Sequence, residues 1–260
     1  MRTAVLISGQ ARSFARISPT DPQIARRAWA RECFSNQRWQ LYRKLENPEF
    51  FVSLADDAEA ALVEPLLLKY YPREIVHVEI VKQPTLPEPP IDATLHSAWG
   101  VSSPFQSILR DLWHRQRVWE FYLGLNSGPP SHQIVLRVRP DIHFHRINLP
   151  KLVQADEVWT PFWGNYGGCN DRLAIMGFSA AEVYFIAFAR VPELLSVGCP
   201  MHPETLTASA VELSPGIRIR RALDAHFAAL RPNGELVMQR LEETLQGFVE
   251  LQLDRQNGIF

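Results

Sequence analysis

Short apolar segments alternate with segments of helical character along most of the chain, and this alternation limits the fold more than any other feature of the sequence. Residues 3–8 (TAVLIS) form a compact apolar run closed by Gly9, as in a buried parallel strand that ends in a turn. The segments with strand character are 3–8, 49–55, 74–81, 133–139, 157–163, 173–178 and 216–222, the last as an edge strand. Strands that alternate with helices predict an α/β sandwich whose mostly parallel central sheet is flanked by helices.

Helical segments are predicted between the strands, and residues 104–123 form the strongest of them. Apolar side chains recur there at helical spacing, from Phe105 to Tyr122. The predicted helices are 21–45, 58–71 with a break at Pro65, 104–123, 180–191 with Ser179 as its cap, a helix that begins at Pro203, and 235–253. Residues 82–104 are rich in Pro and Ser and have no period, so they predict a long loop of the kind that is usually functional or mobile.

Charge and cysteine content argue against several classes of protein. The 260 residues carry a formal net charge of −1 without a basic stripe, so the sequence has no electrostatic signature of nucleic-acid binding. Cys33, Cys169 and Cys199 are widely spaced and form no CxxC pair, which argues against a zinc site built on thiolates. The N-terminal apolar run is shorter than a signal-peptide core, and no segment approaches the ~18 apolar residues of a membrane span. We therefore expect a cytoplasmic protein with no integral membrane segment.

Ligands of such sheets bind at the carboxyl ends of the strands, and the segment SGQAR follows the first strand. Gly9 permits a tight turn, and Ser8, Gln10 and Arg12 would project at the edge of the sheet. Backbone N–H groups and the Arg12 guanidinium would hold a phosphate there. An ordinary strand-to-helix turn is the alternative. Neither GxGxxG nor GxxxxGK[ST] is present, which argues against a dehydrogenase and a P-loop NTPase.

The segment RVRPDIHF, residues 137–144, combines cations, a carboxylate and an imidazole at the end of a central strand. Arg137 and Arg139 are two residues apart, so on a strand they share a face, where they are costly to bury without anions. Asp141 and His143 are chemically suitable ligands for Mg²⁺ or Mn²⁺. The alternative is an internal Arg–Asp ion pair that holds the loop, with the histidines exposed.

Two further segments carry candidate residues. In the loop GGCNDR, Asp171 would orient or deprotonate a hydroxyl nucleophile, with Asn170 beside it and Arg172 on a phosphate, although an Asx-type turn would have the same sequence. In MHPET, His202 and Glu204 flank the Pro that opens a helix, where the helix dipole favours anions. Simple N-terminal capping is the alternative for this pair.

The order of these motifs, from LISGQARSF through FFVSL and VLRVRPDIHF to NDRLAIMG and HPETL, resembles a group of bacterial and viral glycosyltransferase-like proteins. Their recurring signature pairs R-x-R-x-D after a central strand with a later N-D-R-x-A-I-x-G. The resemblance implies a Rossmann-like GT-A-type sandwich, with a nucleotide-sugar-binding catalytic domain over residues 1–221. Residues 222–260 are expected to form a C-terminal helical extension packed on it.

The resemblance also implies roles for the candidate residues. Asp141 would lie where GT-A enzymes place the acidic metal motif that binds the donor diphosphate, with His143 in place of the usual second Asp. Asp171 would be the catalytic base on the sugar or acceptor side. The residues expected to contact the donor are Ser8, Gly9, Gln10, Arg12, Arg137, Arg139, Asn170, Arg172, His202 and Glu204. A divalent cation, Mn²⁺ or Mg²⁺, would be the cofactor.

The expected function is transfer of a sugar from a nucleotide-sugar donor to a hydroxyl of a saccharide or lipid-linked acceptor, as in polysaccharide biosynthesis. One alternative is a non-catalytic nucleotide- or glycan-binding module of the same fold, because His143 replaces an acid. A phosphoryl-transfer or hydrolytic enzyme that uses the same Asp/His cluster is the third hypothesis.

Overall fold

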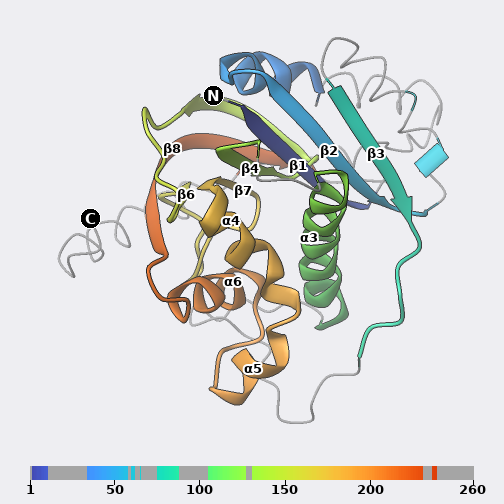
Figure 1. Cartoon of the computed structure of the whole chain (residues 1–260), viewed down its shortest axis with the longest axis vertical. Coiled ribbons are helices and arrows are strands. Elements are labelled where there is room, and N and C mark those ends of the chain that lie inside the picture. The colour runs from blue at the N-terminus through green and yellow to red at the C-terminus, as the bar shows by residue number, and fades with distance from the viewer. Residues whose placement is uncertain are drawn as a thin grey trace.

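A curled sheet of nine strands forms the centre of the molecule in the computed structural model (Figure 1). The structure describes residues 2–10, 34–57, 60–61, 65, 75–87, 105–126, 131–230 and 236–238. The strands are β1 (Thr3–Gln10), β2 (Pro48–Ala55), β3 (Ile75–Val81), β4 (Ile134–Val138), β5 (Ile142–Asn148), β6 (Glu157–Pro161), β7 (Leu173–Gly177), β8 (Arg218–Leu230) and β9 (Leu236–Met238). Their order is β3-β2-β1-β4-β7-β6-β8-β5, and β9 pairs with β8.

Helices cover one face of this sheet, and a second core fills the other face. The helical elements are η2 (Tyr42–Lys44), α3 (Phe105–Leu125), α4 (Phe178–Phe185), η3 (Ile186–Phe188), α5 (Val191–Ser196) and α6 (Pro203–Glu212), and residues 34–40 are also helical. In β1, Ala4 and Leu6 pack toward α3, α4 and α6, whereas Val5 and Ile7 pack toward the core that includes Phe34. Both faces of β1 are therefore buried, which explains its unbroken apolar sequence.

The predicted α/β class is confirmed, although the sheet is mixed. Strands β3, β2, β1 and β4 are all parallel, so their carboxyl ends lie at one edge, called the carboxyl edge below. Strand β7 is antiparallel to both β4 and β6. The connection from β6 to β7, residues 162–172, contains no helix, and it is too short for the crossover that a parallel pair requires. Because β7 is antiparallel, it begins where β4 ends, with Leu173 opposite Val138.

Strands β8 and β5 differ most from the prediction. The segment 216–222 was expected to be an edge strand, but β8 runs to Leu230 in the interior of the sheet, between β6 and β5. Residues 222–230 and 236–238 are thus strands and not part of a helical extension, and residues 239–260 lie outside the described residues. Strand β5, which the sequence analysis left as a strand exit, pairs antiparallel with the second half of β8.

The start of α4 also corrects a prediction. The helix begins at Phe178 with Gly177 as its N-cap, so Ser179 lies inside the first turn and is not the cap. A side chain at Gly177 would overlap the backbone of residues 154–155, and the Ala180 N–H donates to the Ala155 carbonyl at 3.0 Å. Tertiary contact therefore supplies what a capping side chain would otherwise provide.

Several predicted elements fall wholly or partly outside the described residues. Of the helix 21–45, residues 34–40 are helical and η2 follows, and of the loop 82–104, residues 82–87 have no regular structure. Most of the predicted helix 58–71 is not among the described residues. In the part of the chain that the structure describes, no helix has the length and apolar character needed to cross a membrane.

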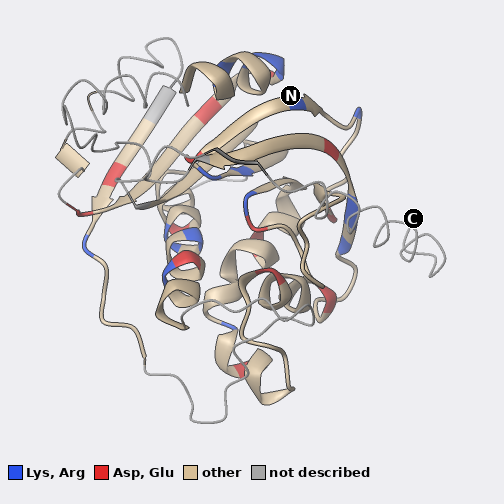
Figure 2. Ribbon diagram, turned by 180° about the vertical axis from the view of Figure 1, so that it is seen from behind, with Lys and Arg blue, Asp and Glu red and all other residues tan. Residues whose placement is uncertain are grey.

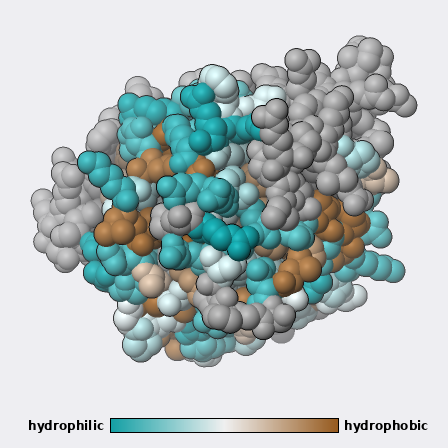
Figure 3. All heavy atoms as spheres, turned by 45° about the horizontal axis from the view of Figure 1, so that its top comes forward, coloured by the Kyte–Doolittle hydropathy of each residue, from teal (hydrophilic) through white to brown (hydrophobic). Residues whose placement is uncertain are grey.

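The large hydrophobic side chains that the described residues expose are spread over several elements, with two of them on α3. They are Trp39, Ile80, Leu123, Leu125, Leu152, Val197 and Leu213. On the face drawn in Figure 3, hydrophobic side chains lie in separate patches between hydrophilic ones. Buried polar side chains lie inside the molecule, and many of them are at the carboxyl edge of the sheet.

Candidate functional site

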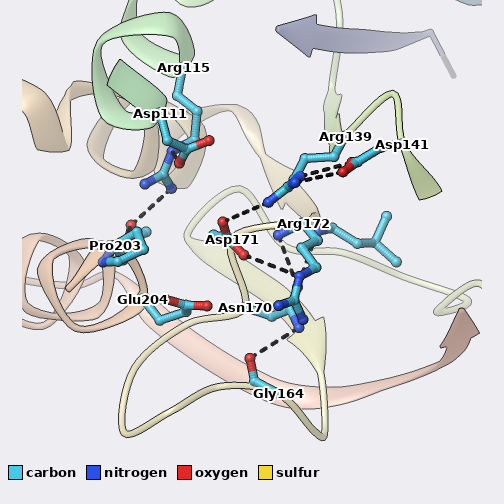
Figure 4. Close-up of polar contacts among 12 residues, drawn as sticks. Asp111, Arg115, Arg139, Asp141, Gly164, Asn170, Asp171, Arg172, Pro203 and Glu204 are labelled. Atoms are coloured by element: carbon cyan, nitrogen blue, oxygen red, sulfur yellow. Dashed lines mark hydrogen bonds and ion pairs between the residues drawn. The ribbon is translucent and has the colours of Figure 1, made fainter. Parts of the chain in front are cut away.

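Polar and charged side chains from five segments meet at the carboxyl edge of the sheet, and Figure 4 labels residues from four of these segments. The segments are the end of β1, the middle of α3, the end of β4 with its turn, the loop before β7 and the start of α6. We call the following residues the carboxyl-edge cluster: Ser8, Asp111, Arg115, Arg137, Arg139, Asp141, Asp171, Arg172, His202 and Glu204. The structure thus brings together four sequence motifs that are separated by up to nearly two hundred residues.

Arg137 occupies the α3 side of β4, where its side chain is almost completely buried. Its Nη1 donates to the carbonyl oxygens of Val138 at 3.0 Å and Ser8 at 3.4 Å. Its Nη2 lies 3.8 Å from Asp111 Oδ1 on α3. Burial lowers the pKa of Arg137 and Asp111 raises it, with a net lowering. The guanidinium is therefore only partly compensated by its surroundings.

Arg139 forms a two-pronged ion pair with Asp141. Its Nε donates to Oδ1 at 3.0 Å, and its Nη2 donates to Oδ2 at 2.7 Å. Its Nη1 also reaches Asp171 Oδ2 at 3.4 Å. Burial lowers the pKa of Arg139, but the two carboxylates raise it well above its usual value. The internal Arg–Asp ion pair, left open as an alternative by the sequence, is present.

Gln37, in the helical segment 34–40, holds the turn that carries this ion pair. The side chain is fully buried, and its amide nitrogen lies 3.2, 3.1 and 2.9 Å from the carbonyl oxygens of Arg139, Pro140 and Ile142. Its amide oxygen accepts a hydrogen bond from the Tyr42 hydroxyl at 2.8 Å. Sequence analysis missed this residue, since a lone Gln in a polar segment carries no signal of burial.

Asp171 lies among the arginines. Arg139 and Arg172 both point toward it in Figure 4, and Arg172 Nε is 3.8 Å from its Oδ1. Burial raises the pKa of Asp171, but Arg139, Arg172, Arg115 and Arg137 together lower it to about 2. A carboxylate with this pKa accepts a proton poorly at neutral pH.

Asn170 shapes the loop around Asp171. Its side chain is buried and bonds to backbone groups: Nδ2 donates to the carbonyls of residues 163 and 164, both at 3.2 Å, and Oδ1 accepts the Arg172 N–H at 3.0 Å. Gly168 lets this loop touch α6, because a Cβ there would overlap the Glu204 carbonyl. The Cys169 N–H donates to that same carbonyl at 2.9 Å. The described contacts give Asn170 a positioning role.

His202 and Glu204 form a buried pair at the start of α6. His202 is the N-cap residue, but its side chain makes no capping hydrogen bond, so simple capping does not describe it. Its Nδ1 instead lies 2.9 Å from Glu204 Oε2. Burial raises the pKa of Glu204, repulsion from Asp171 raises it further, and His202 and Arg172 oppose the shift without cancelling it.

Several buried donors in the cluster have no hydrogen-bond partner within the described part of the chain. They are Arg115 Nη2, Arg137 Nε, Arg172 Nη1 and the Ser8 hydroxyl. Buried polar groups in proteins are nearly always hydrogen-bonded, and an unpaired one is unfavourable by about 1–3 kcal/mol. Asp111 Oδ2, Asp171 Oδ1 and Glu204 Oε2 also lack a hydrogen-bond partner in the described residues, but each lies within ion-pair distance of a cationic or imidazole nitrogen. The unpaired guanidinium donors are therefore the groups that a ligand with hydrogen-bond acceptors would satisfy.

Two residues that sequence analysis missed, Asp111 and Arg115, come from α3. They form an i,i+4 ion pair, and Arg115 Nη1 donates to Thr207 Oγ1 at 2.9 Å. Figure 2 shows acidic and basic residues next to one another along this helix. A signal was present: Arg115 lies within the apolar stripe, seven residues from both Ile108 and Tyr122.

The predicted metal ligands do not form a metal site among the described residues. Both oxygens of Asp141 bind Arg139, and no group of three or more His, Cys, Asp and Glu side chains there is arranged to hold a metal ion. The half-buried His143 lies on β5, with its ring centroid 5.8 Å from that of His145. The donor set does not fit a resident divalent cation in this conformation. The predicted Mn²⁺ or Mg²⁺ has no test here and stays a prediction.

The motif SGQAR, residues 8–12, lies only partly within the described residues. Ser8 and Gly9 end β1 at the carboxyl edge, and the φ of 143° at Gly9 is one that residues with a Cβ rarely adopt. The side chain of Gln10 and the whole of Arg12 lie outside the described residues.

Comparisons with known proteins yield weak likenesses of fold. No protein-family model matches the chain, and no curated protein matches it. Among solved structures, the inositol-1-phosphate CTP transferase from T. maritima is similar over 98% of this chain and 96% of its own, with 10% identity and a TM-score of 0.41. Mouse xyloside xylosyltransferase 1 in its apo form is similar over 85% of this chain and 84% of its own, with 9% identity and a TM-score of 0.36. Likenesses at this level carry no conclusion about activity.

Proposed function

We propose that the protein is a transferase that acts on a nucleotide-sugar donor and passes the sugar to a hydroxyl of a saccharide or lipid-linked acceptor. The observation that supports this most strongly is the set of unpaired guanidinium donors at the carboxyl ends of parallel strands. In α/β sheets this edge is where ligands bind. Guanidinium groups match the geometry of phosphate oxygens with paired N–H donors.

The arginines would act on the leaving group. When the acceptor oxygen bonds to the anomeric carbon, the bond between that carbon and the diphosphate oxygen breaks, and negative charge develops on the departing nucleoside diphosphate. Arg137 and Arg172 would stabilise this charge through the donors that lack a partner. Since these groups are held in place before the reaction, little reorganisation is needed in the transition state.

Glu204 is the better candidate for the base that takes the acceptor's hydroxyl proton. Asp171 was the candidate from the sequence, but its pKa of about 2 makes it a weak base. The pKa of Glu204 is raised by burial and by Asp171, which brings it closer to neutral pH and favours proton transfer. Asp171 would then hold Arg139 and Arg172 in position.

A screen of nucleotide sugars tests this function. The full chain is incubated with each donor, with and without saccharide acceptors, and release of nucleoside diphosphate is measured. The proposal predicts release with one class of donor and its loss in Glu204→Gln. Glu212→Gln is the matched control, because Glu212 is an exposed residue of the same helix that pairs with Arg221 at 3.3 Å. If no nucleotide sugar is bound or turned over, the proposal is wrong.

A non-catalytic binding module is the second candidate, and one observation favours it. Asp141 and Asp171, the two acids expected from the sequence to be catalytic, both contact Arg139. A module of this kind would bind a nucleotide sugar tightly without releasing nucleoside diphosphate. Thermal shift measured beside product release separates the two functions, because a bound donor stabilises the fold whether or not it reacts.

A further inference from the structure

We infer that this site neutralises a diphosphate group with its arginines, in the place where GT-A enzymes use a divalent cation. The ligand class is an anion with two linked phosphate groups, and its identity as the donor diphosphate rests on the proposed function. The inference concerns Arg115, Arg137, Arg139 and Arg172, which come from α3, β4 and the loop before β7.

The first support is the state of Asp141. Both of its oxygens accept charge-assisted hydrogen bonds from Arg139, and the side chain is only 8% exposed. To coordinate a cation, Asp141 would have to release Arg139. The Arg139 guanidinium would then keep one carboxylate, that of Asp171 at 3.4 Å. The exchange would break two charge-assisted hydrogen bonds, which are stronger than neutral ones.

The second support is the set of cationic donors that remain free. Four guanidiniums share the cluster with the carboxyl groups of Asp111, Asp141, Asp171 and Glu204, and Glu204 lies 2.9 Å from His202. Three of the four arginines keep a buried nitrogen without a hydrogen-bond partner in the described residues. An anion that enters this cluster would meet these free donors and satisfy them.

The third support is the distribution of the free donors over separate elements. Arg115 extends from a helix, Arg137 from a strand and Arg172 from a loop, and all three lower the pKa of the same Asp171 carboxylate. Two of the three are 1% exposed, so their directions are fixed by packing. Donors fixed in this way suit an extended anion with several oxygens better than a single carboxylate.

Titration calorimetry of inorganic pyrophosphate into the full chain tests the inference, first with EDTA and then with excess Mn²⁺. We expect binding in EDTA. Arg172→Gln should weaken it at least tenfold. Arg218→Gln, which removes an equal charge from a half-exposed residue paired with Asp156, should change it less than twofold. Binding that requires Mn²⁺, no binding in either buffer, or equal affinity in Arg172→Gln would each overturn the inference.

Asp141→Asn gives a second test, because an arginine site and a cation site predict opposite changes in pyrophosphate affinity. If arginines hold the anion, loss of this carboxylate frees Arg139 and strengthens pyrophosphate binding in EDTA by about threefold or more, through one added charge-assisted bond. If Asp141 holds a cation, the same change weakens binding, and that result would overturn the inference.

The outcomes also separate this inference from the proposed function. Nucleotide-sugar turnover that stops in EDTA would contradict the arginine site and leave the transferase in place. Pyrophosphate binding in EDTA without turnover of any nucleotide sugar supports the arginine site and contradicts the transferase.

Discussion

Two clusters of ion pairs lie at opposite edges of the same parallel strands, and they differ in how completely their members are paired. Arg2, Glu49, His77 and His132 form the amino-edge cluster. Glu49 accepts a bond from Arg2 Nη2 at 2.6 Å, and its oxygens lie 2.9 Å from His77 Nε2 and 3.1 Å from His132 Nε2. The other ring nitrogen of His132 lies 3.3 Å from the Tyr122 hydroxyl. None of these side chains keeps a buried polar atom without a partner in the described residues.

The carboxyl-edge cluster is richer in charge but incomplete. Its arginines bond to aspartates and backbone carbonyls, yet Arg115, Arg137 and Arg172 each retain a buried donor without a partner in the described part of the chain. A network in which every buried polar group is hydrogen-bonded stabilises the fold. In a partly bonded network the unpaired donors are unfavourable, and a bound ligand can satisfy them. The comparison suggests that the amino-edge cluster stabilises the fold and the carboxyl-edge cluster serves function.

The largest expected effect on stability comes from Glu49→Ala. This change removes the partner of Arg2, His77 and His132 together. The buried His132 nitrogen left without its partner lowers the free energy of unfolding by about 1–3 kcal/mol, and the more exposed Arg2 and His77 add smaller losses. Urea unfolding measures the loss, with the exposed Glu212→Ala as control. Pyrophosphate affinity should stay unchanged. A loss below about 1 kcal/mol, the range of surface ion pairs, would contradict a stabilising role for the amino-edge cluster.

His114 lies on α3 beside the carboxyl-edge cluster, and it should make the stability of the fold sensitive to acid. Burial lowers its pKa to about 4, although Asp111 raises it, and neither ring nitrogen has a hydrogen-bond partner in the described residues. The unfolded chain takes up a proton near pH 6.5 while the folded chain does not, so stability falls as the pH falls from 6.5 toward 4. The expected fall is about 2 kcal/mol between pH 6.5 and pH 5.

Urea unfolding of His114→Phe at several pH values checks this expectation. The variant should lose most of the slope between pH 6.5 and pH 5, whereas His145→Gln, a change at an exposed histidine of β5, should keep it. An unchanged slope in His114→Phe would show that other groups carry the acid sensitivity.

Gln37→Met should have a smaller effect on stability and also reach the site. The change removes the amide that bonds the turn after β4 and the acceptor of Tyr42, and it should lower the free energy of unfolding by about 1.5 kcal/mol. Pyrophosphate should bind more weakly, because Arg139 and Asp141 lose the support of their turn. Gln154→Ala, at an exposed position, is the control. Reduced stability with full affinity would mean that the turn keeps its shape without Gln37.

The smallest effect on stability is expected for Arg172→Gln. Its Nε is 3.8 Å from Asp171, and one of its terminal nitrogens is already without a partner in the described residues, so the free energy of unfolding should fall by less than about 1 kcal/mol. Urea unfolding compares this variant with Glu49→Ala. A loss as large as that of Glu49→Ala would show that Arg172 is structural and would remove the contrast between the two clusters.

Sequence analysis predicted the first half of the fold well, because β1, β2 and β4 are buried on both faces and form apolar runs, and the sequence of the edge strand β3 alternates. It also identified four of the five segments that meet at the carboxyl edge, since strand ends follow from strand positions, but not the contribution of α3. It missed β5 and the length of β8, because the segments IHFHRIN and DAHFAAL are rich in His and Ala and have weak strand propensity. Pairing between these two strands, distant in sequence, stabilises both of them.

Within the site, the sequence predicted residue types better than roles. Asp141 was expected to bind a metal ion, and Asp171 to act as a base. Their roles depend on the distance of Arg139 from both carboxylates, which cannot be predicted from spacing along the chain. Arg115 was missed because a charged residue on a helix is usually exposed. Its position within an apolar stripe was the signal of burial.

Location of bound pyrophosphate in crystals of the full chain grown in EDTA tests the central claim most directly. The account predicts anion density within hydrogen-bond distance of Arg137 Nε and Arg172 Nη1, with the Arg139–Asp141 pair opened or shared by the anion. Density confined to the amino-edge cluster or to the protein surface would contradict the account, as would an anion that appears at the carboxyl edge only when Mn²⁺ is bound to Asp141.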